Sequence, residues 1–376
     1  MSIDMYLPSL PTLSQVFAAD IASVQLTLAA FFLGLAVGQI FYGPLADRFG
    51  RKGPLYLGTG LYVLASAGCA LAPDIYSLIV LRFAQAIGGC AGMVIARAVV
   101  RDLFDAQESA RTFSLMMLVM GVAPILAPLA GGYLLVWLGW QSIFWVLALF
   151  GLLCLISVVL WLPETRPAGV PATLGVRSAL AGYGGLLMNR SFLGYTLAGG
   201  FAQAGMFAYI AGSPSVFIDT YHVPAQHYGW LFGMNAFGLI AASQLNRKLL
   251  TNLGAGRVLA RMNAITAGLG VVLLVVAATG AGGFIGILLP LFGYVASLGL
   301  IFPNAAALAL APHGEHAGSA SALLGTVQFG AAAIASILVG LLHDGTALPM
   351  AGVIAGCGIL ALVAQRALVP MQARQG

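Results

Sequence analysis

The sequence predicts an all-α polytopic membrane protein, on three observations. Hydrophobic residues make up 60% of the 376 residues and charged residues only 7%, whereas soluble domains carry about 25% charged residues. The mean hydropathy is +0.98. Charge-free runs such as 23–46 and 53–73 are each long enough for a bilayer-crossing helix, which needs about 20 apolar residues.

The charge balance and the cysteines point away from other classes of protein. In a membrane protein, a net charge of +5 does not indicate nucleic-acid binding. The four cysteines lie inside apolar runs, so neither a disulfide framework nor a metal cluster is indicated; they are Cys69, Cys90, Cys154 and Cys357. The H-E-x-x-H, G-x-S-x-G and P-loop patterns are absent from the sequence. We therefore expect neither an enzyme nor a cofactor.

The first half of the chain combines one short segment with five full-length spans. Residues 1–17 carry Asp4, Pro8 and Pro11 and are too few for a comfortable span. The predicted helices that follow cover about 23–45, 54–72 and 75–99, and two more lie within 112–163, separated by the aromatic break at 137–141. The mixed charge of 97–111 predicts a polar loop before the fifth helix.

The second half repeats this rhythm after the longest polar interval, 163–190, which we interpret as a linker. Its predicted helices cover about 191–218 and 228–246, two spans split near 278–283, then 318–342 and 349–368. A basic loop is expected at 246–257. The predicted domains are an N-terminal helix bundle at 1–162, the linker at 163–190 and a C-terminal helix bundle at 191–376.

Basic residues fall on one side of this topology. Apart from Arg82, every lysine and arginine lies in or beside alternate connections: Arg48, Arg51, Lys52, Arg97, Arg101, Arg111, Arg166, Arg177, Arg190, Arg247, Lys248, Arg257, Arg261, Arg366 and Arg374. The connections between them carry acids only, namely Asp20, Asp74, Asp219 and Asp344. The positive-inside rule then predicts an even number of helices with both termini in the cytoplasm.

The most specific motif is the stretch 43–53, G-P-L-A-D-R-F-G-R-K-G, between the second and third spans. We predict a tight loop in which Gly43 allows close approach of the helix end and Gly50 relaxes the backbone. Asp47 can face a helix N-terminus, while Arg48 and Arg51 hold the loop on the cytoplasmic side.

This stretch resembles the loop between helices 2 and 3 of the major facilitator superfamily, of the form G-x-L-x-D-R-x-G-R-K. The resemblance implies two six-helix bundles related by a pseudo-two-fold axis. It also implies a cytoplasmic gate formed by Gly43, Asp47, Arg48, Gly50, Arg51 and Asp102. In that gate, we expect Arg51 to pair with Asp102 and Asp47 to face the helix start near Gly318 and Ser319.

The first segment carries a narrower resemblance. Its phrase I-D-M-Y-L-P-S-L-P over 3–11 is similar to the second half of helix 1 in drug/proton antiporters of the bicyclomycin-resistance (Bcr/CflA) group. In that group roughly 20 further residues, mostly apolar, come first. We therefore expect that helix 1 is truncated here.

Two charges inside membrane segments are candidates for proton coupling. Arg82 is flanked by charge-free sequence, and a charge at that depth costs several kcal/mol unless it is paired or hydrated. In the antiporters that the chain resembles, an arginine at this point of helix 4 takes part in proton coupling. Asp4 is the acid that we assign to a membrane segment, and it is the expected counterpart of Arg82. The alternatives are an arginine that only pins helices together and an aspartate near a solvated terminus.

The fifth span contains G-V-A-P-I-L-A-P-L-A-G-G over 121–132, which resembles a motif shared by exporters of this superfamily. Ala127 stands where the family form has a glycine. The prolines interrupt the helical hydrogen bonding, and the glycines permit close backbone contact with the opposite half. Ordinary small-residue packing is the alternative. The motif residues are Gly121, Pro124, Pro128, Gly131 and Gly132.

Polar and aromatic residues inside the second-half helices suggest a substrate cavity for lipophilic compounds. They are Gln203, Met206, Phe207, Tyr209, Asn235, Asn304 and Gln328. About half of such residues are expected to be structural or lipid-facing instead. The five histidines lie at loop edges and are expected to be solvated.

Together these features predict a multidrug efflux antiporter of the bacterial inner membrane. It would export lipophilic small molecules by alternating access, be driven by the proton gradient without a cofactor, and act as a monomer that does not bind nucleic acid. A proton-coupled exporter of a metabolite or sugar in the same fold is an alternative. An intramembrane enzyme or a non-transporting sensor is another, but the sequence offers neither a catalytic constellation nor a signalling domain.

Overall fold

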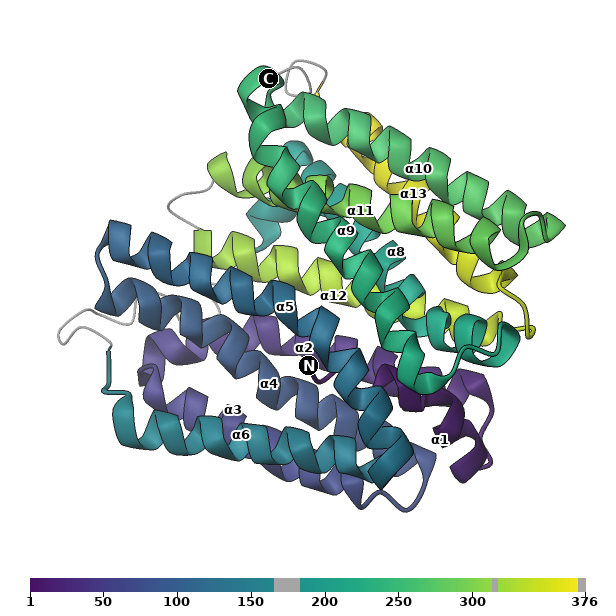
Figure 1. Cartoon of the computed structure of the whole chain (residues 1–376). Helices are drawn as coiled ribbons and strands as arrows, with labels where there is room; N and C mark the ends of the chain where they lie inside the picture. The colour runs from purple at the N-terminus through teal and green to yellow at the C-terminus, as the bar shows by residue number, and fades with distance from the viewer. Residues whose placement is uncertain (166–182, 313–316, 371–376) are drawn as a thin grey trace.

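The computed structural model describes residues 1–165, 183–312 and 317–370. Its described elements are helices throughout, so the predicted all-α fold is confirmed (Figure 1). Most of the predicted linker lies outside the described residues, and the three domain boundaries stay predictions.

The first half begins with a short helical segment and continues with five long helices. The elements are η1 (Leu7–Ser9), α1 (Leu10–Val16), α2 (Ile21–Phe49), α3 (Lys52–Ala70), α4 (Ile75–Leu103), α5 (Ala106–Leu138) and α6 (Gln141–Trp161). Asp20 and Asp74 cap α2 and α4, because their carboxylates accept hydrogen bonds from the backbone N–H of Ser23 and Ser77. These bonds hold the pKa of both carboxyls below its usual value.

Within the described residues, the second half contains six long helices. They are α8 (Arg190–Pro214), which continues into the π-helical turn η2 (Ser215–Thr220), α9 (Ala225–Asn252), α10 (Ala255–Thr279), α11 (Gly283–Leu310), α12 (Ala317–Leu341) and α13 (Leu348–Leu368). Within the described residues, nine helices are long and apolar enough to cross a membrane. One of these spans, 190–220, ends on η2 and so includes Asp219, which we expected in a connection.

Glycines let the helices of each half approach closely. A Cβ on Gly34 of α2 would lie 2.6 Å from the carbonyl oxygen of Phe83 in α4. A Cβ on Gly88 of α4 would lie 2.6 Å from the carbonyl oxygen of Gly58 in α3. Without side chains at these points, the backbones pack by van der Waals contact, which drives helix association in a membrane.

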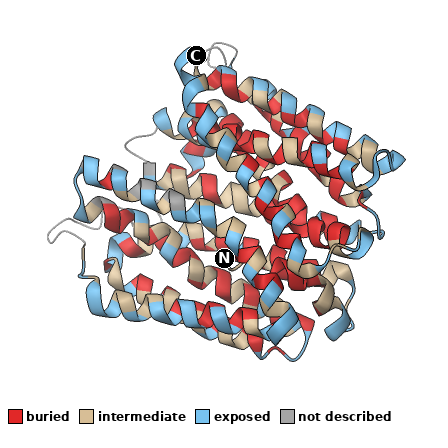
Figure 2. Cartoon of the chain, in the orientation of Figure 1, coloured by how far each residue is buried: buried red, intermediate tan, exposed pale blue. Residues whose placement is uncertain are grey.

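The burial pattern fits a lipid-facing exterior. Buried residues gather along the inner helices, whereas outer helices such as α6 and α10 carry much of the exposed surface (Figure 2). On α6, Trp161 is 75% exposed and Leu160 is 65% exposed. Large apolar side chains exposed along a whole helix are consistent with contact to lipid.

Three predicted loops are wrong. Of the basic loop expected at 246–257, only Leu253 and Gly254 lie between α9 and α10. The stretch 43–49 forms the last turns of α2, so that only Gly50 and Arg51 separate α2 from α3. The stretch 97–111 is also helical except for 104–105, because Asp105 caps α5 by accepting from the N–H groups of Gln107 and Glu108. A run of mixed charge can continue a helix past the membrane face, since charged side chains on a helix reach water.

Candidate transport site and gate

Arg82 of α4 is completely buried, and aromatic rings surround its guanidinium. The Cζ atom lies 4.2 Å from the ring centroid of Phe31, 4.6 Å from that of Tyr6 and 5.8 Å from that of Phe144. A guanidinium is attracted to ring faces by their quadrupole, and the attraction is larger when the pair is desolvated. This arrangement holds a positive charge in the membrane interior without a carboxylate.

Hydrogen bonds fix the same guanidinium on one side only. Its Nη1 donates to Oε1 of Gln85 at 2.6 Å and to the carbonyl oxygen of Ser2 at 3.0 Å. Gln85 in turn donates to Ser66 of α3, and Ser66 donates to the carbonyl oxygen of Tyr62. No described group accepts from Nε or Nη2 of Arg82. Two of its three nitrogens therefore keep donor capacity inside a buried site.

Asp4, which lies in the chain between two residues that contact Arg82, does not pair with Arg82 itself. Its carboxylate lies 3.4 Å from the amino group of Met1, and its side chain is 15% exposed. No salt bridge joins Asp4 to Arg82 among the described residues, so the expected ion pair is absent in this conformation. The coupling role of both residues stays a prediction.

Two residues that flank Asp4 in the chain contact Arg82. Ser2 accepts from Arg82, and the Tyr6 ring lies against the guanidinium while its hydroxyl shares a hydrogen bond with Thr27 of α2. Asp4 lies between these two contacts in the chain. The turn η1, which follows Asp4, contacts α8 and α9 of the second half. The first segment, which carries Asp4, thus contacts both the charged site of α4 and the helices α8 and α9.

The small residues of α5 form the predicted close contact with the opposite half. A Cβ on Gly132 would lie 2.7 Å from the carbonyl oxygen of Ala225, at the start of α9. A Cβ on Gly229 of α9 would lie 2.7 Å from the backbone nitrogen of Leu129. Gly121, farther along α5, lies against Ile240. The backbones of α5 and α9 therefore touch through glycine, while the antiporter role of the motif stays a prediction.

Gly131 contacts the first segment instead. A Cβ at Gly131 would collide with the carbonyl oxygen of Met5. Pro124 and Pro128 lie inside α5 on either side of Ala127, which is fully buried. The segment that carries Asp4 is therefore packed directly against the exporter-like motif.

The proposed cavity residues separate into those with an aromatic surface or an unpartnered polar atom, and one, Asn304, whose amide is bonded to another helix. Phe207 packs against Phe32 of α2 with ring centroids 4.2 Å apart, so an aromatic contact bridges the two halves. Asn235 donates to the Tyr209 hydroxyl at 3.0 Å, and the buried Oδ1 of Asn235 has no described partner. Asn304, in contrast, donates to Oδ1 of Asn246 at 2.8 Å and is 2% exposed. Asn304 is therefore one of the residues with a structural role that we expected among the cavity candidates.

The remaining three cavity candidates are partly buried. Gln203 and Met206 lie on α8, and Gln328 lies on α12. The amide nitrogen of Gln328 lies 3.8 Å from the Cβ position of Gly199, so α8 and α12 approach each other at this level. Their partial exposure leaves them able to contact a substrate, and their role stays a prediction.

At the charged end of the bundle, Arg51 connects α2 to α4. Its Nε donates to Oδ2 of Asp102 at 2.8 Å, and its Nη1 donates to Oδ1 of Asp47 at 2.6 Å. The predicted contact of Arg51 with Asp102 is thus present. Ion pairs with a guanidinium are among the stronger hydrogen bonds in proteins. The gating role of these residues, including that of Arg48, stays a prediction.

Gly50 has the role that we expected for it, whereas Gly43 does not. Gly50 adopts a φ of 86°, which L side chains rarely adopt, and Glu164 occupies the space beside its Cα. A Cβ at Gly43 would meet nothing within 4 Å, so no close approach requires this glycine. The reason is that α2 continues to Phe49 and does not end at Gly43.

Sequence reasoning missed Glu164. Its carboxylate accepts from the backbone N–H of Arg51 at 2.8 Å and of Lys52 at 3.1 Å, and it thereby caps the N-terminus of α3. The hydroxyl of Thr165 donates to Asp102 at 3.3 Å. An acid directly after the sixth predicted span, at the same membrane face as 43–53, was the available signal.

The register of α2 against α12 places Asp47 level with the start of α12. The hydroxyl of Thr326 donates to the carbonyl oxygen of Ala36 at 3.3 Å, and a Cβ on Gly325 would lie 3.0 Å from the Gln39 side chain. The helices run antiparallel, so the same register brings Asp47 to the first turn of α12. Its expected contact with Gly318 and Ser319 stays a prediction, because the described partner of Asp47 is Arg51.

Known proteins resemble this chain over nearly its full length. A Bacillus subtilis (strain 168) protein called uncharacterized MFS-type transporter YdgK is 37% identical over 94% of this chain and 88% of its own. The bicyclomycin resistance protein homolog of Haemophilus influenzae is 33% identical over 96% of this chain and 91% of its own. The multidrug resistance protein MdtL of Escherichia coli is 27% identical over 96% of this chain and 90% of its own.

Solved structures show the same fold at low sequence identity. The crystal structure of a D-xylose-proton symporter has a TM-score of 0.75 at 17% identity, over 98% of this chain and 94% of that one. A bacterial homolog of the human lysosomal transporter Spinster has a TM-score of 0.74 at 14% identity over the same shares. The sequence profile of the Major Facilitator Superfamily matches residues 1–336. Fold, motif and relatives agree: the chain is a multi-pass membrane transporter of the major facilitator superfamily.

Proposed function

We propose that the protein is a proton-coupled exporter of lipophilic small molecules in the bacterial inner membrane. The observation that carries the proposal is the buried Arg82, which has two unpartnered nitrogens and is contacted by Ser2 and Tyr6, on either side of Asp4 in the chain. Charges inside membrane segments are costly and mark ion or substrate pathways. The names of two relatives, a bicyclomycin resistance homolog and a multidrug resistance protein, support drugs as the substrate class.

Proton exchange follows from the distance between a carboxylate and Arg82. When Asp4 approaches the guanidinium, its ionised form is favoured and a proton is released. When Asp4 withdraws into apolar surroundings, its neutral form is favoured and a proton is bound. The unpartnered Nε and Nη2 of Arg82 are the donors that such an approach would use.

Coupling to export requires that the substrate act on the same movement. The turn η1, which follows Asp4, contacts α8, the helix that carries Tyr209, and Tyr209 is bonded to Asn235 in the predicted cavity. A substrate against Phe207 and Tyr209 would therefore change the surroundings of Asp4. By linkage, proton binding must then change substrate affinity by the same factor.

The segment with Asp4 also offers the moving contact between the halves. It packs on Gly131 of α5, and α5 touches α9 through Gly132 and Gly229. Two halves in contact through small residues can rock about those contacts, as alternating access requires. The site therefore connects proton binding to the relative position of the halves.

The experiment is substrate-driven proton movement in proteoliposomes that contain the purified protein and an internal pH dye. A panel of lipophilic drugs and a panel of sugars are added in turn under a fixed proton gradient. We expect proton release with members of the drug panel and none with the sugars. Proton movement that only the sugars cause would contradict the proposal. A lack of proton movement with every compound of both panels would also contradict it.

A further inference from the structure

At the end of the bundle where Asp20 caps α2, the side-chain amide of Gln25 joins the two halves. Gln25 lies on α2 of the first half and is only 2% exposed. Its Nε2 donates to the carbonyl oxygen of Ala211, on α8 of the second half, at 3.3 Å. Because the acceptor is a carbonyl oxygen, the amide nitrogen must face it, which fixes the orientation of the amide. One hydrogen bond therefore connects α2 to α8 across the interface between the halves.

The carbonyl group of Ala211 is available because α8 stops being a regular α-helix just after it. In a continued α-helix, the N–H of Ser215 would donate to the carbonyl oxygen four residues earlier, which is that of Ala211. Here Ser215 donates to Gly212 instead, and the chain continues as the π-helical turn η2. The preceding residue, Pro214, has no N–H to offer. The change of helix thus removes the usual donor of Ala211, and Gln25 supplies one from the other half.

The oxygen of the same amide weakens this contact. Oε1 of Gln25 is buried and has no described partner. It lies against α12 of the second half, since a Cβ on Gly340 would be 3.0 Å from this oxygen. A buried acceptor without a donor has lost its bonds to water and has gained none in return. The contact therefore favours the closed arrangement of this end less than a fully bonded amide would.

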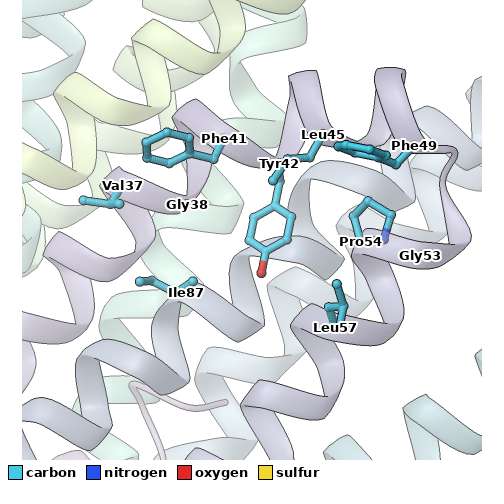
Figure 3. A pocket seen from close by; sticks show the side chains of 10 residues that line it. All are labelled: Val37, Gly38, Phe41, Tyr42, Leu45, Phe49, Gly53, Pro54, Leu57 and Ile87. Atoms are coloured by element: carbon cyan, nitrogen blue, oxygen red, sulfur yellow. The ribbon is translucent and has the colours of Figure 1, made fainter. Parts of the chain in front are cut away.

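The pocket beside Gln25 spans the same interface. Its volume is about 210 Å³, and it is lined by α1 and Gln25 from the first half and by Ser215 and Asp219 of η2 from the second. Among the lining residues, Asp219 carries the one charge. A larger groove around Tyr42, in contrast, is lined by the first half alone (Figure 3). A rigid movement of the halves therefore reshapes the pocket at Gln25 but not the groove at Tyr42.

We propose that Gln25 is the latch of this end of the transporter: its bond to Ala211 holds the halves together, and its unpartnered oxygen lets them part. The latch rests on the function proposed above, because alternating access requires each end of the bundle to open in turn. Gln25 thus acts on the relative position of the halves and takes no part in binding the proton or the drug.

The test replaces the amide of Gln25 by a carboxyl group. Gln25→Glu keeps the size of the side chain, but an ionised carboxylate cannot donate to Ala211 and is repelled by its carbonyl oxygen. A protonated carboxyl can donate, and burial and the carboxylate of Asp219 both favour that form. Acid should therefore restore the bond. Gln15→Glu is the matched control, because Gln15 lines the same pocket from α1 but is exposed.

Spin labels measure how far this end has opened in the purified protein. They are attached at Leu71→Cys and Ala281→Cys, two exposed positions in connections of the first and second half at this end. Cys154, the native cysteine that is not buried, is replaced by serine. Double electron–electron resonance then gives the populations of the short and long distances between the labels.

We expect Gln25→Glu to raise the long-distance population about five-fold at pH 9, as the loss of one hydrogen bond predicts. At pH 5 this population should return to that of the labelled parent, and Gln15→Glu should match the parent at both pH values. Equal populations in the two variants would overturn the inference. An opening by Gln25→Glu that persists at pH 5 would also overturn it.

A second pair of variants removes the bond without adding a charge. Gln25→Asn keeps the amide but shortens the side chain by one methylene, which withdraws the donor from Ala211. It should raise the long-distance population at both pH values, whereas Gln15→Asn should not. If Gln25→Glu does not fold, this pair decides, and an unchanged population in Gln25→Asn would refute the latch. The distance measurement needs neither drug nor proton gradient, so its result is independent of whether drug-driven proton release occurs.

Discussion

The guanidinium of Arg82 lies 4.6 Å from the ring centroid of Tyr6, so the buried charge of α4 lies against the segment that contains Asp4. Ser2, on the other side of Asp4, accepts a hydrogen bond from the same guanidinium. A displacement of this segment therefore changes the distance from Asp4 to Arg82. The proposed coupling depends on that change.

Arg82→Lys should impair coupling although it keeps the charge. A lysine ammonium lacks the planar fork of donors, and it cannot stack on Tyr6 and Phe31 in the same way. We expect at least a ten-fold loss of drug-driven proton release, and a loss of about 1–3 kcal/mol in stability because Gln85 loses its partner. Proteoliposome flux and thermal unfolding measure the two effects. Arg190→Lys, at an exposed helix start, serves as the control; equal flux in both variants would count against the role of Arg82.

Gly131→Ala should weaken the contact between α5 and the first segment. The added methyl would collide with the carbonyl oxygen of Met5, which is backbone and cannot rotate away. We expect a lower unfolding temperature and slower transport. The matched change is Gly92→Ala on α4, where a Cβ meets nothing within 4 Å, and it should leave the unfolding temperature unchanged. Equal effects of the two substitutions would show that the contact has no special role.

Asp47→Asn should shift the protein toward the conformation that is open at the end of the bundle where Arg51 binds Asp102. The substitution removes the carboxylate that binds Arg51 and that lies level with the N-terminus of α12. A carboxylate near a helix N-terminus contributes about 0.3–1 kcal/mol, which is enough to change a balanced population several-fold. We expect slower transport and faster thiol labelling of a cysteine introduced by Gln328→Cys. If neither rate changes, Asp47 does not hold the gate.

Glu164→Gln should destabilise the start of α3. Glutamine keeps the shape but replaces a charged acceptor of the Arg51 and Lys52 N–H groups by a neutral one. We expect a loss of about 0.5–2 kcal/mol in the free energy of unfolding. Because exposed charges are screened, the difference between the two proteins should shrink at 1 M salt. A difference that is independent of salt would assign the effect to side-chain packing.

Most helices were predictable from the sequence, because a membrane demands long apolar runs and penalises charges within them. The prediction failed where helices leave the membrane. Residues 43–49 and 97–111 carry charges that suggest loops, yet a helix can continue into water with charged side chains on its surface. Hydropathy marks the membrane boundary and not the end of the helix.

The candidate site was predictable only in part. Arg82 could be found as a charge in an apolar run, and its pairing with Asp4 was the simplest expectation. In the structure, the Arg82 guanidinium contacts Ser2, Gln85 and aromatic rings instead of Asp4. Ser2 and Arg82 are 80 positions apart, and the contact depends on how the first segment packs. No local pattern encodes that packing.

The central claim, that Asp4 carries the exchanged proton, is tested most directly by Asp4→Asn in the proteoliposome assay. Asp20→Asn is the matched control, since Asp20 caps α2 and asparagine caps a helix equally well. We predict that Asp4→Asn abolishes drug-driven proton release while it still inserts, folds and binds drug, and that Asp20→Asn behaves like the unmodified protein. Normal proton release by Asp4→Asn, with an unaltered pH dependence, would contradict the account.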